Sequence, residues 1–397
     1  MAESLGIFGS KQNLSRERTP GEEARVEYVE LFFDLVFVFA VTQISHALLN
    51  QLTVLGAFRA AFLLLAVWWV WVYTAWVTNW IDPRYWPVRF MLFVLMLAGL
   101  VLSTSIPEAF EGRGLGFACA YVFMQVGRSV FMLWALRQHN RTNYLNFLRI
   151  SAWLSLSGVF WIVGAFLEGE ARFAAWIVAL LIEYVAPSAG FWTPRIGASR
   201  TVEWDVEGGH MAERSALFII IALGESVLET GATFSELQPT LGVVVAFLAS
   251  FGGTVAMWWI YFNIGAESAK QQIAASADPG RIARVAYTYS PVLLVAGIIV
   301  TAVADELTLG HPTVYPADIT TTLTVVGGPA LYVFGNLVFK RITAGILPLS
   351  HVIGLALLLI AALAAPYLNA VTLSVVTTVI LFMVGYWEHV LHRRSGR

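Results

Sequence analysis

Acidic and histidine side chains occur within an apolar stretch near the start of the sequence, residues 26–49. A helix turns 100° per residue, so Glu30 and Asp34 share one face, and Thr42 and His46 lie at the edge of that face. Carboxylates and an imidazole along one helix face can pass protons or bind small cations. Two simpler interpretations stay open: Glu30 can complement the helix dipole, and Asp34 can belong to a structural salt bridge.

A second apolar stretch, residues 211–231, carries a similar set of groups. His210 and Glu213 lie three residues apart at its start and therefore share a helix face, while Glu225 lies about 18 Å deeper than Glu213. An acid near the centre of a membrane helix costs about 2.5 to 3.5 kcal/mol, so it has to be paired, protonated or functional. Both a group that titrates near neutral pH and a neutral acid hydrogen-bonded across helices meet this requirement.

One cation and two further acids also lie in apolar stretches. Arg128 keeps its proton, so it needs a carboxylate or a cluster of carbonyl oxygens as its partner. The acids that could pair with Arg128 are Asp34, Glu183, Glu225 and Glu388. We expect Arg128 to be a fixed counter-charge, and Glu183 and Glu388 to be secondary buried acids.

Motifs for metal or nucleophilic chemistry are not found in the sequence. His210-x-x-Glu213 lacks the HExxH spacing of zinc peptidases, and Glu388, His389 and His392 would need further ligands to hold a metal. Neither Gly-x-Ser-x-Gly nor a Walker pattern occurs. The sequence therefore shows neither the nucleophile motif of a serine hydrolase nor the phosphate-binding motif of an ATP-driven pump. We predict interfacial histidines, no metal and no cofactor.

Composition requires that these side chains be positioned by membrane helices. The chain is 58% hydrophobic and 13% charged, with a mean hydropathy of +0.71, which excludes a soluble globular protein. About 20 apolar residues span the hydrocarbon as a helix, because lipid offers no partner for backbone groups. We predict an all-α polytopic protein with twelve spans at residues 28–49, 56–78, 87–106, 115–137, 149–168, 172–191, 211–231, 241–264, 282–304, 319–340, 346–366 and 369–391.

The distribution of charge indicates the orientation of these spans. With both termini in the cytoplasm, most of the 24 Lys and Arg residues fall on the cytoplasmic side, and the outer loops carry acids that include Asp305 and Glu306. We therefore expect a multi-pass protein of the cell (cytoplasmic) membrane. The net charge of -2 and the scattered basic residues argue against nucleic-acid binding, and the lone Cys119 excludes a disulfide framework. The expected partners are the lipid bilayer and protons or small cations, and a homo-oligomer is compatible with this plan.

The two halves of the chain resemble each other in collinear order. Glu30 aligns with Glu213, the Trp-rich run 68–76 with 258–266, and the sequence around Glu183 with that around Glu388. Two parallel six-helix repeats would place a polar path between them, and the Trp-rich runs are interpreted as packing rather than as a substrate cage. The predicted organisation is a cytoplasmic tail at 1–25, a first repeat at 26–195, a linker at 196–210 and a second repeat at 211–397.

Four motifs together resemble one known family. They are Glu30-Leu-Phe-Phe-Asp34 with the following Thr42-Gln43 and His46, Thr78-Asn79-Trp80, His210-x-x-Glu213-Arg214, and Gly224-Glu225-Ser226. From about residue 25 onward the sequence resembles the low temperature requirement protein A (LtrA) family of bacterial membrane proteins. It departs from the family pattern at Ser215-Ala216 and at Tyr289-Ser290-Pro291, where the family often has a histidine. The resemblance implies a link to growth in the cold, a stress response, but no established biochemical activity.

A fainter similarity concerns the first helix alone. Residues 32–42 look like the helix that opens each six-helix unit of the endolysosomal and bacterial potassium-channel family, with Phe33 in place of the motif serine. That similarity implies a first helix that lines a pore.

These patterns favour a transporter or channel for protons or small cations, with its path between the two repeats. The residues assigned to that path are Asp34, Glu225, Thr42, Gln43, Glu30, Glu213, His46 and His210. One alternative is an intramembrane enzyme acting on a lipid-like substrate, with Asp34 or Glu225 as the general base. Another is a non-catalytic membrane component whose buried acids are purely structural.

Overall fold

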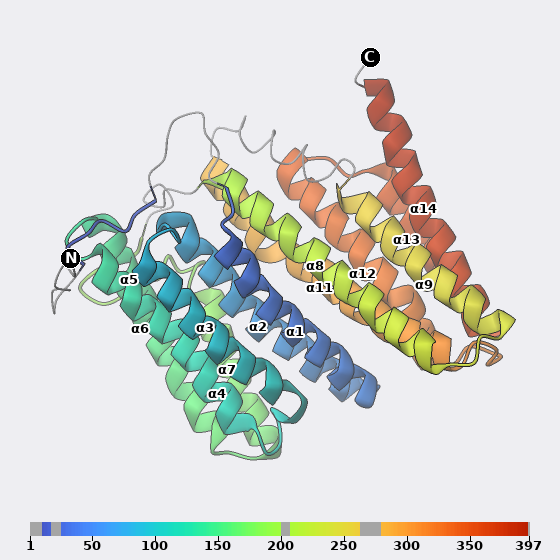
Figure 1. Ribbon diagram of the computed structural model, residues 1–397, viewed down its shortest axis with the longest axis horizontal. Helices are drawn as coiled ribbons and strands as arrows, with labels where there is room; N and C mark the ends of the chain where they lie inside the picture. The colour runs from blue at the N-terminus through green and yellow to red at the C-terminus, as the bar shows by residue number, and fades with distance from the viewer. Residues whose placement is uncertain (1–9, 17–24, 200–206, 263–278, 396–397) are drawn as a thin grey trace. The chain divides into compact units, whose positions relative to one another are not determined.

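The structure of the protein is a computed structural model that describes residues 10–16, 25–199, 207–262 and 279–395. Within these ranges the regular elements are helices, and no β-strand forms (Figure 1). The helices are α1 (Tyr28–Asn50), α2 (Val54–Trp80), α3 (Trp86–Ser105), α4 (Gly114–Val122), α5 (Arg128–Leu136), α6 (Arg141–Ala165), α7 (Gly169–Val185), α8 (Gly208–Glu236), α9 (Leu241–Ile260), α11 (Pro279–Gly310), α12 (Ile319–Ala344), α13 (Leu349–Ala364) and α14 (Ala370–Ser395). The predicted tail 1–25, linker 196–210 and repeat match 258–266 lie partly outside the described residues, as does the side chain of His392.

Eleven helical segments of the described chain are long and apolar enough to cross a membrane. A π-helical turn, Phe123–Gly127, joins α4 and α5 into one such segment, Gly114–Leu136. The predicted sixth span corresponds to α7, which has 17 residues and is at the lower limit of a spanning helix. The prediction of an all-α, multi-pass membrane protein is therefore confirmed.

The loop boundaries differ from prediction at the end of α11. This helix continues to Gly310, so Asp305 and Glu306, expected in an outer loop, lie within the helix. Acidic residues lowered the hydropathy of the last turns and suggested a loop there. The helix continues because its other side chains, such as Leu309, are buried in the bundle.

The chain divides into two compact units. The first comprises Met1–Gln43 and Leu65–Met211, and the second comprises Ile44–Leu64 and Ala212–Arg397. The predicted domain boundaries and the parallel arrangement of two repeats stay predictions.

In the first unit, α6 packs against α4, α5 and α7, and α3 packs against α4. The side chain of Asn140 accepts a hydrogen bond from the backbone N–H of Asn143 at 3.0 Å and so caps the start of α6. Between α4, α6 and α7 lies an aromatic cluster in which the Trp161 ring is 4.4 Å from Tyr121 and 5.3 Å from Trp176. This packing surrounds the acid on α7.

In the second unit, α12 packs closely against α11 and also contacts α13, while α14 packs against α9 and α13 (Figure 1). Glycines allow the closest of these approaches. A Cβ at Gly297 of α11 would lie 2.7 Å from the backbone N of Tyr332, and a Cβ at Gly328 of α12 would lie 2.7 Å from the backbone N of Thr301. Small residues at such crossings are how membrane helices gain packing contacts without a hydrophobic driving force.

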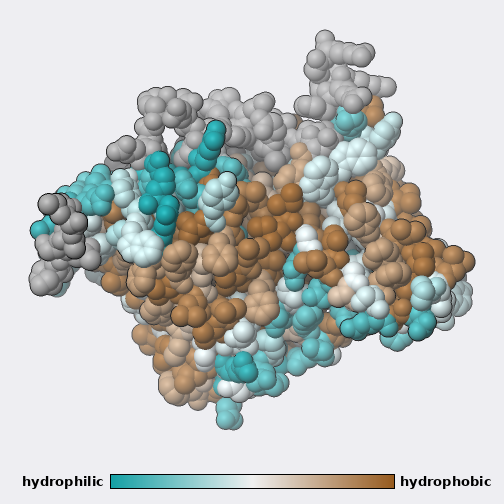
Figure 2. All heavy atoms as spheres, viewed as in Figure 1, coloured by the Kyte–Doolittle hydropathy of each residue, from teal (hydrophilic) through white to brown (hydrophobic). Residues whose placement is uncertain are grey.

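Hydrophobic side chains cover much of the face shown in Figure 2, along the flanks of the helices. Leu97, Leu228, Leu248 and Leu363 are among the exposed large hydrophobic residues. A surface of this kind is suited to lipid rather than to water.

Adjacent glycines on α12 provide a test of the helix crossing. Gly328→Ala places a methyl group against the backbone of α11, whereas a Cβ at Gly327 meets nothing within 4 Å. Overpacking of this kind costs about 1–3 kcal/mol, so we expect Gly328→Ala to lower the thermal unfolding midpoint of detergent-purified protein relative to Gly327→Ala. Equal midpoints for the two variants would contradict the close crossing.

Candidate functional site

Glu30 lies in a buried polar cluster at the start of α1, in the first unit. Its side chain is fully buried, and its Oε1 is 3.0 Å from Nε2 of His210. Its Oε2 accepts hydrogen bonds from the backbone N of Glu27 at 2.9 Å and from Nη2 of Arg16 at 3.4 Å. The structure thus brings two predicted residues, Glu30 and His210, into contact, and complementing the helix dipole is not the only role of Glu30.

The imidazole of His210 is held by groups from α2 and the residues just before α8. The amide nitrogen of Asn79 is 3.4 Å from Nδ1 of His210 and also donates to the carbonyl oxygen of Glu207 at 2.8 Å. Because this amide nitrogen can only donate, Nδ1 accepts, and Nε2 is left to donate its hydrogen to Glu30. The backbone N of His210 in turn donates to Oε2 of Glu207 at 3.0 Å.

Arg16 is a member of this cluster that sequence reasoning missed. Its side chain is 7% exposed, and its backbone N donates to the carbonyl oxygen of Trp80 at 2.9 Å, which fixes the segment 10–16 against the end of α2. Its Nη1 also donates to the carbonyl oxygen of Arg25 at 3.1 Å. Nothing in a polar tail distinguishes one arginine from its neighbours, so no signal in the sequence could have identified Arg16.

A charged pair closes the turn after α2. Oδ2 of Asp82 accepts hydrogen bonds from Nε of Arg84 at 2.9 Å and from its Nη2 at 2.6 Å. Burial raises the pKa of Asp82, but the hydrogen bonds and charge of Arg84 outweigh burial and hold that pKa below its ordinary value. The turn that carries Asn79 and Trp80 toward the cluster is therefore closed by an ionised carboxylate at neutral pH.

Asp34 lies one turn deeper in α1 and is fully buried. Its Oδ1 accepts a hydrogen bond from Nε1 of Trp71 at 2.7 Å. The neighbouring Trp68 and Trp71 rings are 4.7 Å apart, and Trp69 stacks on Tyr184 at 4.0 Å. The Trp-rich run thus packs tightly and supplies a donor to the acid, as the packing interpretation predicts.

Arg128 has neutral partners in the first unit. Its Nη1 donates to the carbonyl oxygen of Val70 at 3.1 Å and to the hydroxyl of Thr74 at 2.8 Å, and its Nη2 donates to the amide oxygen of Gln125. Its guanidinium also lies over the ring of Tyr73, 5.4 Å from the centroid. Of the two kinds of partner expected, the structure shows the carbonyl and hydroxyl cluster rather than a directly paired carboxylate.

Glu183 of α7 is satisfied by four donors. Its Oε2 accepts from the hydroxyl of Tyr121 at 2.7 Å and from the amide of Gln125 at 2.9 Å, and its Oε1 accepts from Ser157 at 2.5 Å and from Trp161 at 3.0 Å. Gln125 therefore links Glu183 to the Arg128 cation. This amide lies in the π-helical turn, a local widening of the helix that often occurs at functional sites.

Glu388 of α14 forms a buried ion pair in the second unit. Its Oε2 is 2.5 Å from Nζ of Lys340, and its Oε1 is 3.3 Å from Nδ1 of His351 and 3.4 Å from the hydroxyl of Ser350. Lys340 lies in the last turns of α12, at the end of the predicted span 319–340, and is only 7% exposed.

The acids of α7 and α14 are held in corresponding ways. Glu183 accepts from side chains of the two preceding helical segments of its unit, α4 with its π-helical turn and α6. Glu388 is bound by side chains from the two helices that precede α14, which are α12 and α13. This correspondence agrees with the alignment of Glu183 and Glu388, although duplication of the whole unit stays a prediction.

At the far end of α1, in the second unit, His46 meets an acid of α8. Its Nε2 is 3.5 Å from Oε2 of Glu229, and the two side chains are 41% and 33% exposed. Glu229 was not singled out from the sequence, although it lies four residues after Glu225 on the same helix face.

The remaining predicted path residues differ in burial. Thr42 is 5% exposed, and its hydroxyl donates to the carbonyl oxygen of Val38 at 3.2 Å. Gln43 and Glu225 are half-buried, and Glu213 is exposed. Within the described residues no group of three or more His, Cys, Asp or Glu side chains could hold a metal ion.

A known protein family matches the part of the chain that contains these residues. The model of the family described as bacterial low temperature requirement A protein (LtrA) matches residues 25–386, nearly the whole chain. The chain belongs to the LtrA family. Glu30, Asp34, Asn79 and His210, which the structure buries, all lie within the matched part.

A relative of this LtrA protein is an uncharacterised protein of Rhizobium meliloti (strain 1021). The two are 42% identical over 385 residues, which is 97% of this chain and 93% of the relative. No solved structure matches the chain. The predicted family is confirmed, whereas the similarity of the first helix to a potassium-channel helix stays a prediction.

Loss of the Lys340 cation should destabilise this LtrA protein. Lys340→Met leaves Glu388 buried without its ion-pair partner, and breaking one side of a buried pair costs about 3–5 kcal/mol. We expect a large fall in the thermal midpoint, substantially recovered in the double variant Lys340→Met with Glu388→Leu. Arg341→Met, at an exposed neighbouring cation, is the matched control. Additive losses in the double variant would contradict the pairing.

Proposed function

We propose that this LtrA-family protein transports protons or small cations across the membrane, with the titratable side chains of α1 on the transport path. The observation that carries the proposal is the spacing of Glu30, Asp34 and His46 along this single helix. Asp34 lies about 6 Å beyond Glu30, and His46 lies about 18 Å beyond Asp34. Together they cover most of the roughly 30 Å of a bilayer core.

The two ends of α1 carry groups that can exchange protons. At one end His210 and Glu30 are within hydrogen-bond distance, 3.0 Å, and Nη2 of Arg16 lies 3.4 Å from Oε2 of Glu30. At the other end His46 and Glu229 are partly exposed and 3.5 Å apart, where they are accessible to ions from the surrounding water. We assign the first end to the cytoplasmic side, which agrees with the predicted orientation.

We assign Asp34 to the part of the transport path between these two ends of α1. It is completely buried in an apolar helix, where an acid is costly unless it has a function or a partner. The indole of Trp71 donates a hydrogen bond to Oδ1 and so orients the carboxylate. The hydroxyl of Thr42, the amide of Gln43, and Glu213 and Glu225 of α8 are assigned to the same path.

Ion flux in liposomes tests the role of Asp34. We expect purified wild-type protein to dissipate an imposed proton or cation gradient, and Asp34→Asn to reduce that flux at least tenfold, because an amide cannot take up and release a proton. Glu111→Gln, an exposed acid in the loop before α4, is the matched control and should keep wild-type flux. Trp71→Phe keeps the carboxylate and should retain measurable flux.

Two results would contradict transport. One is the absence of flux in folded wild-type protein under every gradient tried, which would favour the enzyme or the structural alternative. The other is undiminished flux in folded Asp34→Asn. Folding of each variant is checked by its elution profile and thermal midpoint in detergent.

Growth in the cold tests whether the proposed ion flux underlies the low-temperature growth that the family resemblance implies. If transport underlies low-temperature growth, a strain lacking this protein should regain growth at low temperature with the wild-type or Glu111→Gln chain but not with Asp34→Asn. Equal rescue by Asp34→Asn, expressed at the same level in the membrane, would separate the growth phenotype from the proposed path.

A further inference from the structure

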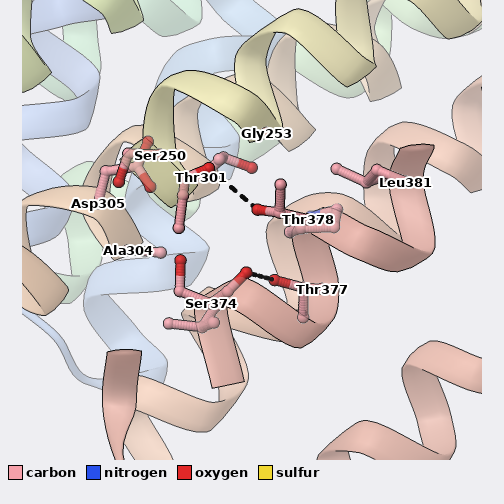
Figure 3. Close-up of a pocket in the computed structure, with 12 residues that line it drawn as sticks. Ser250, Gly253, Thr301, Ala304, Asp305, Ser374, Thr377, Thr378 and Leu381 are labelled. Carbon is pink, nitrogen blue, oxygen red and sulfur yellow. Dashed lines mark hydrogen bonds between the residues drawn. The ribbon is translucent and has the colours of Figure 1, made fainter. Parts of the chain in front are cut away.

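A small cavity lies in the second unit, among α9, α11, α12 and α14 (Figure 3). About 20 Å³ of it is open to the centres of water-sized molecules, which is room for one small ion or water molecule. Its lining is rich in side-chain oxygen, contributed by Ser250, Thr301, Asp305, Ser374, Thr377 and Thr378. None of the residues assigned to the α1 path lines this cavity.

Polar atoms in the cavity wall are buried without a partner. Oδ2 of Asp305 and Oγ1 of Thr301 have no hydrogen-bond partner, although both residues are only 5% exposed. The two residues are four apart on α11 and therefore share a face. The Ser250 side chain, only 2% exposed, lies beside the Asp305 carboxylate (Figure 3). These two oxygens lie in the wall of a cavity with room for a ligand, and a ligand bound there would satisfy them.

The donor set identifies the class of ligand. Every polar side chain in the lining offers oxygen, and hard cations prefer oxygen ligands. Thr377 and Thr378 donate their hydroxyl hydrogens to the carbonyl oxygens of Ser374, at 2.9 Å, and of Ala249, at 3.0 Å, and so keep lone pairs for a cation.

The number of charges selects among cations. Asp305 is the one ionisable residue among those lining the cavity, so the wall supplies a single negative charge. A divalent ion would remain uncompensated there, whereas a monovalent ion is neutralised. The cavity has room for one such ion. Of the common monovalent cations, we expect sodium, the smaller and harder one, to suit carboxylate and hydroxyl ligands best.

Helix packing places these oxygens together. Gly328 of α12 lies against Thr301, where even a methyl group would collide with the Thr301 hydroxyl and backbone. Gly253 of α9 faces Thr378 of α14, where a Cβ would lie 3.4 Å from the Thr378 hydroxyl, at ordinary contact distance. The close approach brings hydroxyls from three helices around one carboxylate.

We propose that the Asp305 cavity is a binding site for one sodium ion, coordinated by the carboxylate of Asp305 and by hydroxyls that include those of Thr301 and Ser250. The site goes beyond the proposed transport path, because it lies in the second unit and shares no residue with that path. It makes this LtrA-family protein a sodium-binding protein whether or not sodium is the ion that moves.

Equilibrium binding of radioactive sodium to the purified full-length chain in detergent tests the site. We expect saturable binding of about one ion per chain in the wild type, with potassium competing at least tenfold more weakly than sodium. Asp305→Asn should weaken sodium binding at least tenfold. Glu306→Gln removes the same charge from the next residue, which does not line the cavity, and should bind sodium as the wild type does.

A second variant keeps the test decisive if Asp305→Asn does not fold. Thr301→Val keeps the shape of the side chain and the carboxylate but removes one ligand oxygen, so it should weaken sodium binding several-fold in folded protein. Sodium chloride should also raise the thermal midpoint of the wild type above that in choline chloride, and this increase should vanish in Thr301→Val and Asp305→Asn.

Three results would overturn the site. They are no saturable sodium binding by folded wild type, unchanged binding in folded Asp305→Asn, or unchanged binding in folded Thr301→Val. Absent sodium binding would mean that a protonated Asp305 or a water molecule satisfies the cavity. Flux that depends on Asp34 without sodium binding overturns only this site, whereas sodium binding without flux overturns only the transport proposal.

Discussion

A helix surrounded by lipid gives its buried polar side chains no water to bind, so each of them depends on donors and acceptors from neighbouring helices. That constraint governs how the helices of each unit of this LtrA protein pack. Glu183 receives four hydrogen bonds from the side chains of α4, the π-helical turn and α6. Glu388 is contacted by Lys340 of α12 and by His351 and Ser350 of α13. In each unit, satisfying one acid fixes three helices relative to one another.

The buried charges are compensated in different ways, and the difference bears on what each can do. Arg128 and Glu183 share Gln125, whose oxygen accepts from one and whose nitrogen donates to the other, so a neutral amide lies between the two charges. Four donors hold the Glu183 carboxylate in place, which suits a structural acid. Glu30 instead contacts an imidazole, a group that can both donate and accept a proton. The contrast supports a proton-exchange role for the first cluster and a structural role for Glu183.

Asp305 is a buried acid with an oxygen that the packing leaves open. Its Oδ2 is buried without a hydrogen-bond partner, next to a hydroxyl in the same condition, although nearby helices offer many polar groups. Glu183 shows that this fold can saturate a buried acid, so the open oxygen of Asp305 beside a cavity supports the proposed ligand site. Gly328 of α12 packs against Thr301, which lines the cavity, so the close helix crossing also positions one hydroxyl of the proposed site.

The sequence alone determined the membrane class, nearly all of the helical segments, the family and several buried polar residues, because hydropathy and motifs are local properties of the chain. It singled out Glu30, Asp34 and His210 as path residues, and Glu183 and Glu388 as buried acids. Only the tertiary structure decided their partners: Arg16 with Glu30, Lys340 with Glu388, and Asp305 at a cavity instead of in a loop. Arg16 and Lys340 are distant in sequence from the acids that they neutralise. A hydrogen bond or an ion pair forms through space, so its partners are set by which helix faces pack together, and that packing is not encoded in any single segment.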